Sequence, residues 1–245
     1  MGILDQPTSY FDGGRVIRGD IELSGDLFQN PIRIGLDAQT LPDTFAIGRG
    51  ADATGTDSIS VGNLSKATNT FAAAFGLRAE ATGQDATAIG SDTTAPSNWN
   101  TVIGYDAGAA NNGENVVLVG RKSEAQGNDS VAIGEVSRAN GNQSTAVGRD
   151  TDALSDAASA FGQGSTANGI GTTIVGQGVE VTTDQATTVG TNVTVSGTGA
   201  TAIGRGSTAI GQESVSIGKG AESNGLNSVA VGSNSVVDRD NAYGF

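Results

Sequence analysis

Hydrophobic and polar positions repeat with one short period along most of the chain. Between Phe45 and Val236 a bulky residue followed by glycine recurs, as in Ile133-Gly134. These marker glycines are Gly48, Gly62, Gly76, Gly90, Gly104, Gly120, Gly134, Gly148, Gly162, Gly176, Gly190, Gly204, Gly218 and Gly232. Neighbouring markers are 14 residues apart, except for one step of 16 that adds two residues around Asn111 and Asn112. Such self-similarity is typical of a repeat architecture, in which the motif is structural.

Each repeat divides into two halves of seven residues. A small residue, usually alanine, stands five positions after the marker glycine, and a second glycine often stands seven after it, as at Ala139 and Gly141. Fourteen residues are too few for two helices but fit two strands of about four or five residues and two tight turns. The sequence therefore predicts an all-β roll, or β-solenoid, with one 14-residue coil per repeat. At about 4.8 Å per coil the rod is on the order of 65 Å long.

The alternation of side chains leaves one apolar face more than a closed roll needs. In the first strand of each unit the position before the glycine is bulky, and the opposite face is mostly small and apolar, as at Ala132 and Ala146. The second strand alternates small residues with charged ones such as Glu124 and Arg138. One apolar face per strand is enough to form the core of the roll. The second apolar face of the first strand must therefore be covered by another molecule, and the simplest one is another copy of the chain. We predict an obligate homo-oligomer and favour a homotrimer.

The repeated motif resembles a known family. The segment from Ser130 to Gly141, Ser-Val-Ala-Ile-Gly-Glu-Val-Ser-Arg-Ala-Asn-Gly, and its near-copies at 144–153 and 228–235 are similar to the YadA-like head repeat of trimeric autotransporter adhesins. The resemblance covers residues 45–237. It implies a left-handed parallel β-roll, three chains around one axis, and a surface-exposed head that adheres to other surfaces.

The chain also departs from that family. Residues 1–7 do not resemble a secretory signal peptide, and no neck motif or heptad stalk follows the last repeat. These departures favour a virion fibre or spike that attaches the particle to its host. A capsid decoration or turret without a receptor role and the head of a cellular trimeric adhesin remain the alternatives. Localisation is accordingly expected on the virion surface, with the cell surface as the second possibility.

Composition and charge limit the classes of molecule that the chain can bind. The chain has 38 glycines, 36% apolar and 4% aromatic residues, which favours an elongated repeat body. A net charge of −13 disfavours nucleic acid, which requires clustered Lys and Arg, and no apolar run is long enough for membrane insertion. Aspartate outnumbers glutamate, and three lysines stand against ten arginines. This balance favours a halophilic source, with an ordinary acidic, aggregation-resistant surface as the alternative.

Catalytic chemistry has little support. The chain contains no histidine and no cysteine, and its serines belong to repeated structural positions. Strings such as Gly162-Gln-Gly164 lack the third glycine of a nucleotide-binding loop. We therefore predict no enzyme, no cofactor and no dedicated metal site. Sporadic cation binding at Asp238 and Asp240 is a secondary hypothesis, and Arg18-Gly19-Asp20 is interpreted as a chance match to an integrin motif.

The two ends break the repeat. Residues 1–44 are predicted to be a cap or attachment segment with some β structure, in which Tyr10, Phe11 and Phe28 contact other virion proteins. The motif Ile32-Arg-Ile-Gly35 indicates a degenerate first coil within it. Residues 238–245 are predicted to be a C-terminal tail beyond the 45–237 roll.

A few residues interrupt the regular surface and are the candidates for contact with a host surface glycan or protein. They are Trp99, Tyr105, Asn111, Asn112, Tyr243 and Phe245. Aromatic side chains are enriched among contact residues. For Trp99 the favoured alternative is packing across a subunit boundary. For Tyr243 and Phe245 it is a hydrophobic lid on the final coil.

Overall fold

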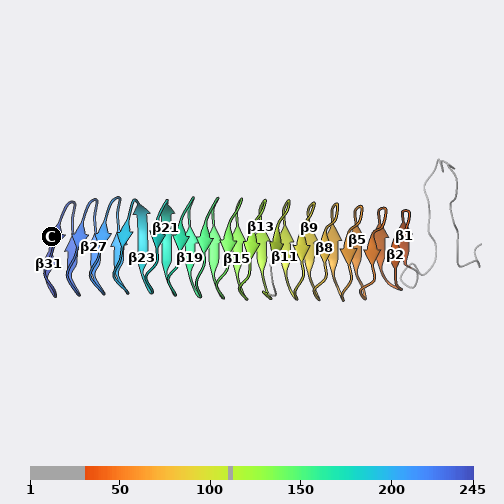
Figure 1. Ribbon diagram of the computed structural model, residues 1–245, viewed down its shortest axis with the longest axis horizontal. Helices are drawn as coiled ribbons and strands as arrows, with labels where there is room; N and C mark the ends of the chain where they lie inside the picture. Colours follow the sequence, from red (N-terminus) through yellow and green to blue (C-terminus); the bar gives the residue numbers. More distant parts are fainter. Residues whose placement is uncertain (1–30, 110–112) are drawn as a thin grey trace, which may run out of the picture.

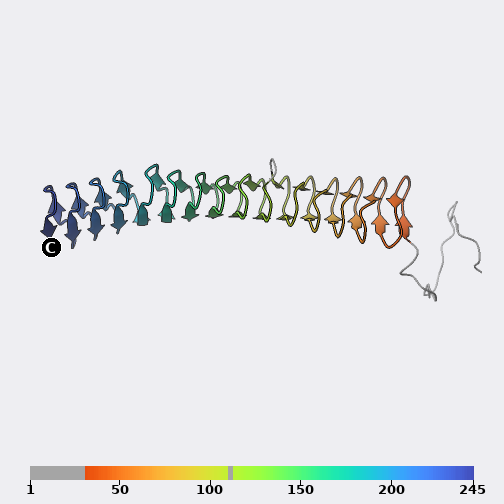
Figure 2. The ribbon, with the colours of Figure 1, turned by 90° about the horizontal axis from the view of Figure 1, so that it is seen from below.

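The described part of the chain forms an elongated rod of stacked coils (Figure 1) that is gently curved (Figure 2). The computed structural model describes residues 31–109 and 113–245, and in this part of the chain all regular structure is β. Each coil contributes one strand to each of two sheets, and successive coils stack side by side along the long axis (Figures 1 and 2). The predicted β-solenoid is thus confirmed. The described residues include no helix long and apolar enough to cross a membrane.

The first sheet consists of the odd-numbered strands in sequence order. They are β1 (Ile32–Ile34), β3 (Phe45–Ile47), β5 (Ile59–Val61), β7 (Ala73–Phe75), β9 (Thr87–Ile89), β11 (Thr101–Ile103), β13 (Val117–Val119), β15 (Val131–Ile133), β17 (Thr145–Val147), β19 (Ser159–Phe161), β21 (Thr173–Gln177), β23 (Thr187–Thr191), β25 (Thr201–Ile203), β27 (Val215–Ile217), β29 (Val229–Val231) and β31 (Tyr243–Gly244).

The second sheet consists of the even-numbered strands and is interrupted between β22 and β24. They are β2 (Gln39–Thr40), β4 (Asp52–Ala53), β6 (Lys66–Ala67), β8 (Glu80–Ala81), β10 (Thr94–Ala95), β12 (Gly108–Ala109), β14 (Glu124–Ala125), β16 (Arg138–Ala139), β18 (Asp152–Ala153), β20 (Thr166–Ala167), β22 (Glu180–Val181), β24 (Thr194–Val195), β26 (Thr208–Ala209), β28 (Glu222–Ser223) and β30 (Val236–Val237).

Every strand pair is parallel and in repeat register. Val131 of β15 pairs with Thr145 of β17, one period further along the chain, and Glu124 of β14 pairs with Arg138 of β16. The register is the same across the 16-residue step, where Thr101 of β11 pairs with Val117 of β13. The predicted bulged loop at Asn111 and Asn112 lies outside the described residues.

The strands are shorter than the predicted four or five residues. Most strands of the first sheet have three residues, and those of the second sheet have two. The reason is a residue with left-handed backbone conformation at every turn, so that such residues recur every seven positions, as at Asp129 (φ 55°), Val136 (φ 58°) and Gln143 (φ 57°). Each ends the extended segment before it. We call the turn after an odd-numbered strand the first turn and the turn after an even-numbered strand the second turn.

Two different constraints explain the two glycines of the repeat. The marker Gly134 has φ 139°, and a Cβ atom there would lie 2.1 Å from the carbonyl oxygen of Gly148 in the next coil. The second glycine, Gly141, does not need a positive φ, but its Cβ would lie 2.0 Å from the carbonyl oxygen of Ser155. Backbone proximity between coils therefore selects glycine at both positions.

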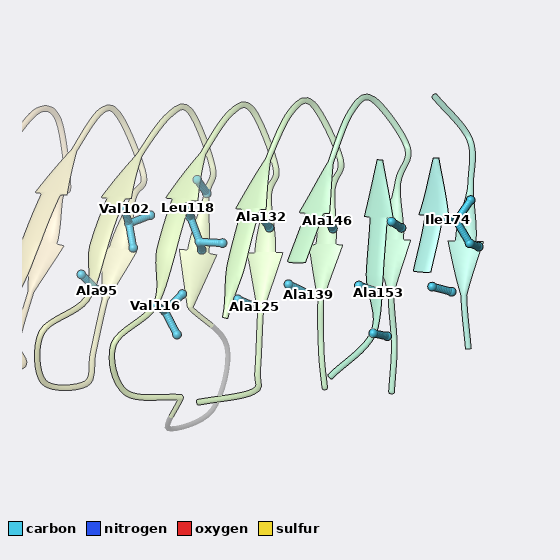
Figure 3. Close-up of a cluster of buried hydrophobic side chains, with 14 of the residues drawn as sticks. Ala95, Val102, Val116, Leu118, Ala125, Ala132, Ala139, Ala146, Ala153 and Ile174 are labelled. Carbon is cyan, nitrogen blue, oxygen red and sulfur yellow. The ribbon is translucent and has the colours of Figure 1, made fainter. Parts of the chain in front are cut away.

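The core between the sheets is narrow and built from small side chains. Inward residues of both sheets, such as Ala132 and Ala139, are fully buried, and Figure 3 shows this row of alanines between the strands. Among the described residues, Leu118 and Ile174 are the largest fully buried side chains. Because alanine buries little apolar area, each coil gains only modest hydrophobic stabilisation within one chain.

One buried asparagine forms hydrogen bonds with the described end of the second turn in the 16-residue coil. Asn100 is fully buried where other coils place Ser, Ala, Thr or Val. Its Nδ2 donates a hydrogen bond to the carbonyl oxygen of Gly113 (3.0 Å), and its Oδ1 accepts one from the backbone N–H of Val116 (3.0 Å). The side chain thus replaces backbone hydrogen bonds that the insertion displaces.

Both ends of the described roll extend beyond residues 45–237. Ile32 of β1 pairs with Phe45 of β3, so the Ile32–Gly35 motif does form a coil, as the sequence indicates. At the other end Tyr243 of β31 pairs with Val229 of β29, so part of the predicted tail belongs to the first sheet. Tyr10, Phe11, Phe28 and the Arg18–Asp20 match lie outside the described residues.

Candidate functional site

The outer face of the first sheet carries a continuous row of exposed apolar side chains. We call this row, formed by the residues just before the marker glycines, the apolar stripe. Nine of its members, Phe75, Ile89, Ile103, Val119, Ile133, Phe161, Val175, Val189 and Ile217, are 37–44% exposed. The in-register pairing aligns them, so that Val119, Ile133 and Val147 are direct neighbours. The predicted additional apolar face therefore exists, and it points away from the core of the single chain.

The second outward position of the same strands widens the stripe. Val117, Val131 and Val215 occupy it in some coils and threonines such as Thr145 and Thr173 in others, all at least partly exposed. Large contiguous apolar surfaces on a folded chain mark sites of interaction with another molecule. Chemically the stripe can exclude water against a second apolar surface.

The outer face of the second sheet is polar, as the sequence predicts. Lys66 Nζ lies 2.6 Å from Glu80 Oε1 one coil further on, and Arg138 donates two hydrogen bonds to Asp152, at 2.8 and 2.6 Å. The hydrogen bonds to Asp152 raise the pKa of Arg138. The exposed Lys66–Glu80 pair contributes about 0–1 kcal/mol, so its main effect is to keep this face hydrated. In the Arg138–Asp152 pair the carboxylate side chain is only 12% exposed.

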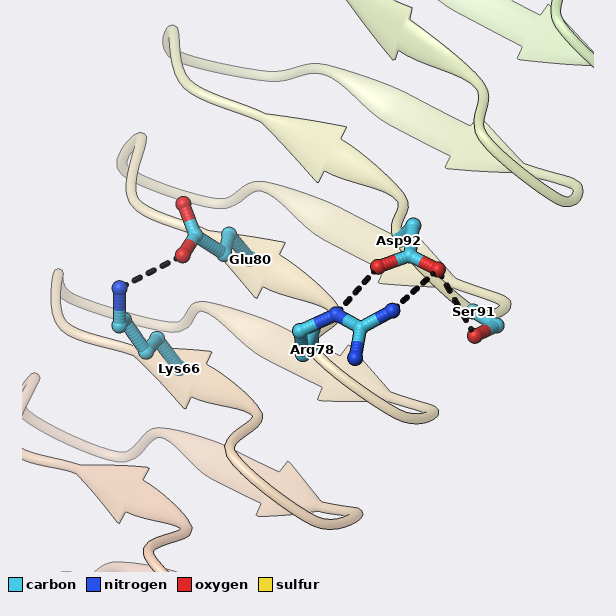
Figure 4. A network of polar contacts seen from close by, with 5 residues as sticks. All are labelled: Lys66, Arg78, Glu80, Ser91 and Asp92. Atoms are coloured by element: carbon cyan, nitrogen blue, oxygen red, sulfur yellow. Dashed lines mark hydrogen bonds and ion pairs between the residues drawn. The ribbon is translucent and has the colours of Figure 1, made fainter.

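The first turns hold a similar ladder of charges. Arg78 donates hydrogen bonds to both carboxylate oxygens of Asp92, and Ser91 Oγ contacts the same carboxylate at 3.3 Å (Figure 4). The hydrogen bond from Arg78 lowers the pKa of Asp92, and the pKa of Arg78 rises in return. These groups are structural neighbours in successive coils and form no cleft.

The second turns carry a ladder of amide and carboxylate side chains. Asn98, Asn128, Asn142 and Asp156 each accept, at 2.8–3.1 Å, a hydrogen bond from the backbone N–H of the equivalent residue in the preceding coil. Asp240 does the same for the N–H of Leu226 at 2.8 Å. Asp238 accepts a hydrogen bond from Asn224 Nδ2 at 2.7 Å. The two aspartates proposed for cation binding therefore already serve the ladder.

The described ranges, 31–109 and 113–245, contain no group of three or more Asp or Glu side chains arranged to hold a metal ion.

The predicted contact residues do not form one site. Trp99 lies in a second turn, 48% exposed, and Tyr105 lies in the following first turn, 53% exposed. Strand β11 separates them, so the two rings stand at opposite edges of the rod. Asn111 and Asn112 are outside the described residues.

At the C-terminal end the predicted lid is wrong. Tyr243 is 72% exposed and Phe245 is 94% exposed, so neither side chain covers the last coil. Tyr243 instead continues the outward-facing row of the first sheet beside Val229. Both rings remain available to a partner at this end of the rod.

Sequence reasoning missed Phe71. This residue is 55% exposed and occupies the same repeat position as Trp99, nine residues after a marker glycine. Aligning the repeats by their marker glycines and comparing exposed turn positions would have found the pair.

Comparison with known proteins identifies the repeat. The rod is a parallel β-solenoid with one apolar and one polar outer face. Residues 53–79, 81–98, 125–151, 196–221, 209–235 and 223–242 match the YadA head domain repeat. The chain therefore contains a YadA-like head β-roll. A crystal structure of the collagen-binding domain of the Yersinia adhesin YadA aligns with 90% of this chain and 82% of that chain, at 22% identity and a TM-score of 0.30. A search of curated proteins finds no match.

Proposed function

We propose that the protein is a non-enzymatic, homotrimeric, surface-displayed fibre or spike that attaches its bearer to a host cell. The apolar stripe is the observation that carries this proposal. It runs the length of the described roll on one face, whereas the opposite face is charged. Three chains with their stripes turned toward a common axis would remove the stripe from water and leave three polar faces outside. The match to YadA head repeats supports the same assembly.

The energetic argument for association follows from the core. A core of alanine and serine gives one chain little buried area, and the stripe holds the larger side chains. At about 25 cal/mol per Å² of apolar surface removed from water, burial of the stripe residue in each coil would add to the small contribution that the alanine and serine core makes in the same coil. We therefore expect the assembled rod, not the single chain, to be the stable species.

Light scattering on paired variants tests the assembly. The wild-type chain should have three times the monomer mass of 24.3 kDa in low and in molar salt. Ile133→Asp places a charge in the stripe and should give monomers or unfolded chain, because it buries three carboxylates near the axis. Ile210→Asp is the matched control, since Ile210 is 49% exposed in a second turn, away from the stripe. The trimer proposal would be wrong if the wild-type chain were a folded monomer, or if Ile133→Asp and Ile210→Asp dissociated to the same extent.

As the bearer we propose a virion, with the cell surface as the alternative. A rod of constant cross-section suits a spike that holds a contact surface away from a particle, and its aromatic residues at the turns and at the C-terminal end suit attachment. Immunogold labelling distinguishes the two bearers. Antibodies against the roll are applied to virus particles and to cells of the source that have been separated from each other. Label on projecting fibres supports the proposal. Label spread over the shell indicates a capsid decoration, and label on cells alone indicates a cellular adhesin.

A further inference from the structure

Phe71 and Trp99 form an aligned pair of exposed aromatic rings along one edge of the rod. Both occupy the tip of a second turn, two coils apart, with Asp85 at the equivalent position between them. Backbone hydrogen bonds keep these tips in line, since Asp85 N–H donates to Thr70 (2.9 Å) and Trp99 N–H donates to Gln84 (2.9 Å). Two coil spacings place the rings about 10 Å apart along the axis.

The backbone at both aromatic residues is strained. Phe71 has φ 56° and Trp99 has φ 57°, in the left-handed region that disfavours bulky side chains. Other coils fill this position mainly with Asp, Asn, Gln or Gly. Both rings remain about half exposed, so packing within the chain does not offset the strain. The fold requires the left-handed conformation at this position but not a bulky aromatic side chain, and a strained residue type that the fold does not require is typical of functional positions.

The polar neighbours of the rings are held in place. Asn98 Oδ1 accepts a hydrogen bond from Gln84 N–H (3.0 Å), and its Nδ2 donates to Glu114 Oε1 (3.2 Å). Gln84 Nε2 donates to Asp85 Oδ2 (3.2 Å). These amides and carboxylates have further hydrogen-bonding capacity toward solvent. The edge thus offers two stacking surfaces with oriented donors and acceptors beside them.

The charges at this edge select the ligand class. Within the second turns 54–58, 68–72, 82–86, 96–100 and 113–116, the charged residues are Asp57, Asp85 and Glu114, all acidic. An anionic glycan would be repelled here. A neutral sugar ring fits, because its C–H face stacks on an aromatic ring while its hydroxyls bond to carboxylates and amides.

We propose that Phe71 and Trp99 form a platform for a neutral, extended, β-linked polysaccharide that lies along the long axis of the rod. Alternate sugar rings in such a chain are spaced comparably to the two aromatic rings, so each aromatic side chain stacks on one ring. Asp85 accepts hydrogen bonds from hydroxyl groups of the sugar between them. This inference rests on the proposed attachment function and names the chemical class of its ligand.

Titration of the full-length chain tests the platform. Trp99 is the only tryptophan, so its fluorescence reports directly on this site. Neutral hexasaccharides, cellohexaose and hexa-N-acetylchitohexaose, should shift and saturate the emission, whereas oligogalacturonate should not. If no neutral hexasaccharide changes the fluorescence, or if acrylamide cannot quench Trp99 in the assembled protein, the platform does not exist and Trp99 is a packing residue.

Paired variants separate binding from folding. Phe71→Asn and Trp99→Asn introduce a residue type that other second turns use, so the fold should persist with equal or higher thermal stability. Each should weaken hexasaccharide binding at least tenfold by calorimetry, whereas Tyr105→Ala at the opposite edge should leave it unchanged. An equal loss in Tyr105→Ala would overturn the assignment.

Host attachment by the same variants distinguishes this inference from the proposed function. If Trp99→Asn abolishes attachment and soluble hexasaccharide competes with the wild type, the platform is the receptor site. If the trimer forms and attaches while all three variants behave as the wild type, the attachment function stands and the platform is wrong. In a third outcome, Trp99→Asn abolishes attachment, but neither soluble sugars nor glycosidase treatment of the host affects it. That result indicates a protein receptor and also overturns the platform.

Discussion

Replacing the marker glycine Gly134 by alanine should destabilise the roll far more than replacing Gly164, another glycine in a first turn. Gly134 has φ 139°, and an added Cβ would lie 2.1 Å from the carbonyl oxygen of Gly148. Gly164 has φ 65°, and a Cβ there would meet nothing within 4 Å. Gly134→Ala and Gly164→Ala therefore make the same chemical change with and without a collision between coils.

The magnitude follows from the backbone conformation of Gly134 and from two hydrogen bonds between coils. The backbone conformation of Gly134 costs alanine about 1–3 kcal/mol. To relieve the contact the coils must part by on the order of 1 Å, which weakens backbone hydrogen bonds worth about 1 kcal/mol each. The bonds at risk are those between the two colliding coils, Gly148 N–H to the carbonyl of Ile133 at 2.8 Å and Asp150 N–H to the carbonyl of Glu135 at 2.9 Å. We expect a loss of about 4 kcal/mol for Gly134→Ala.

For Gly164→Ala the left-handed conformation costs about 1 kcal/mol and is partly offset by the reduced entropy of the unfolded chain. The net loss should be about 0.5 kcal/mol. Denaturant unfolding at one fixed protein concentration measures both values, because the stability of an assembly depends on concentration. Hydrogen exchange over 128–150 locates the opening, since repeat proteins unfold locally. Losses within about 1 kcal/mol of each other, or an unchanged Gly134→Ala, would refute the argument from coil contact.

Three further predictions concern single side chains. Asn100→Ala should cost about 3 kcal/mol in denaturant unfolding, because it leaves two buried backbone groups unpaired, whereas Ser144→Ala, which removes a buried hydroxyl without a partner, should cost nothing. Val136→Asn should raise the free energy of unfolding by about 1 kcal/mol, since a β-branched residue at φ 58° is strained and asparagine tolerates that conformation; a lower free energy of unfolding would contradict this. Arg78→Gln should lower stability slightly at neutral pH. Because Arg78 lowers the pKa of Asp92, this difference should be complete above about pH 4 and vanish as the pH falls through the lowered pKa. A difference that grows in acid would exclude the pair as its source.

Much of the fold is readable from the sequence because its constraints are local. Strand faces alternate with a period of two, so the order of Val131, Ala132 and Ile133 already assigns outward, inward and outward positions. The marker glycines identify where each coil turns. The apolar stripe follows from the same alternation, and the structure confirms it.

Other properties depend on how coils stack. Strand length could not be predicted, because left-handed turn residues such as Val136 and Trp99 are not residue types that signal that conformation. The role of Asn100 depends on a backbone segment 13 to 16 residues away that only stacking brings within reach.

The candidate binding residues illustrate the same division. Trp99 and Tyr105 are six residues apart in sequence, yet β11 sends them to opposite edges of the rod. Phe71 and Trp99 are 28 residues apart, yet two whole coils place them in line. The sequence by itself determined the period, the inward and outward faces and the positions of the turns, because φ preferences and side-chain alternation act within a few residues. Only the tertiary structure decided which side chains share an edge, because that depends on the in-register stacking of one coil on the next.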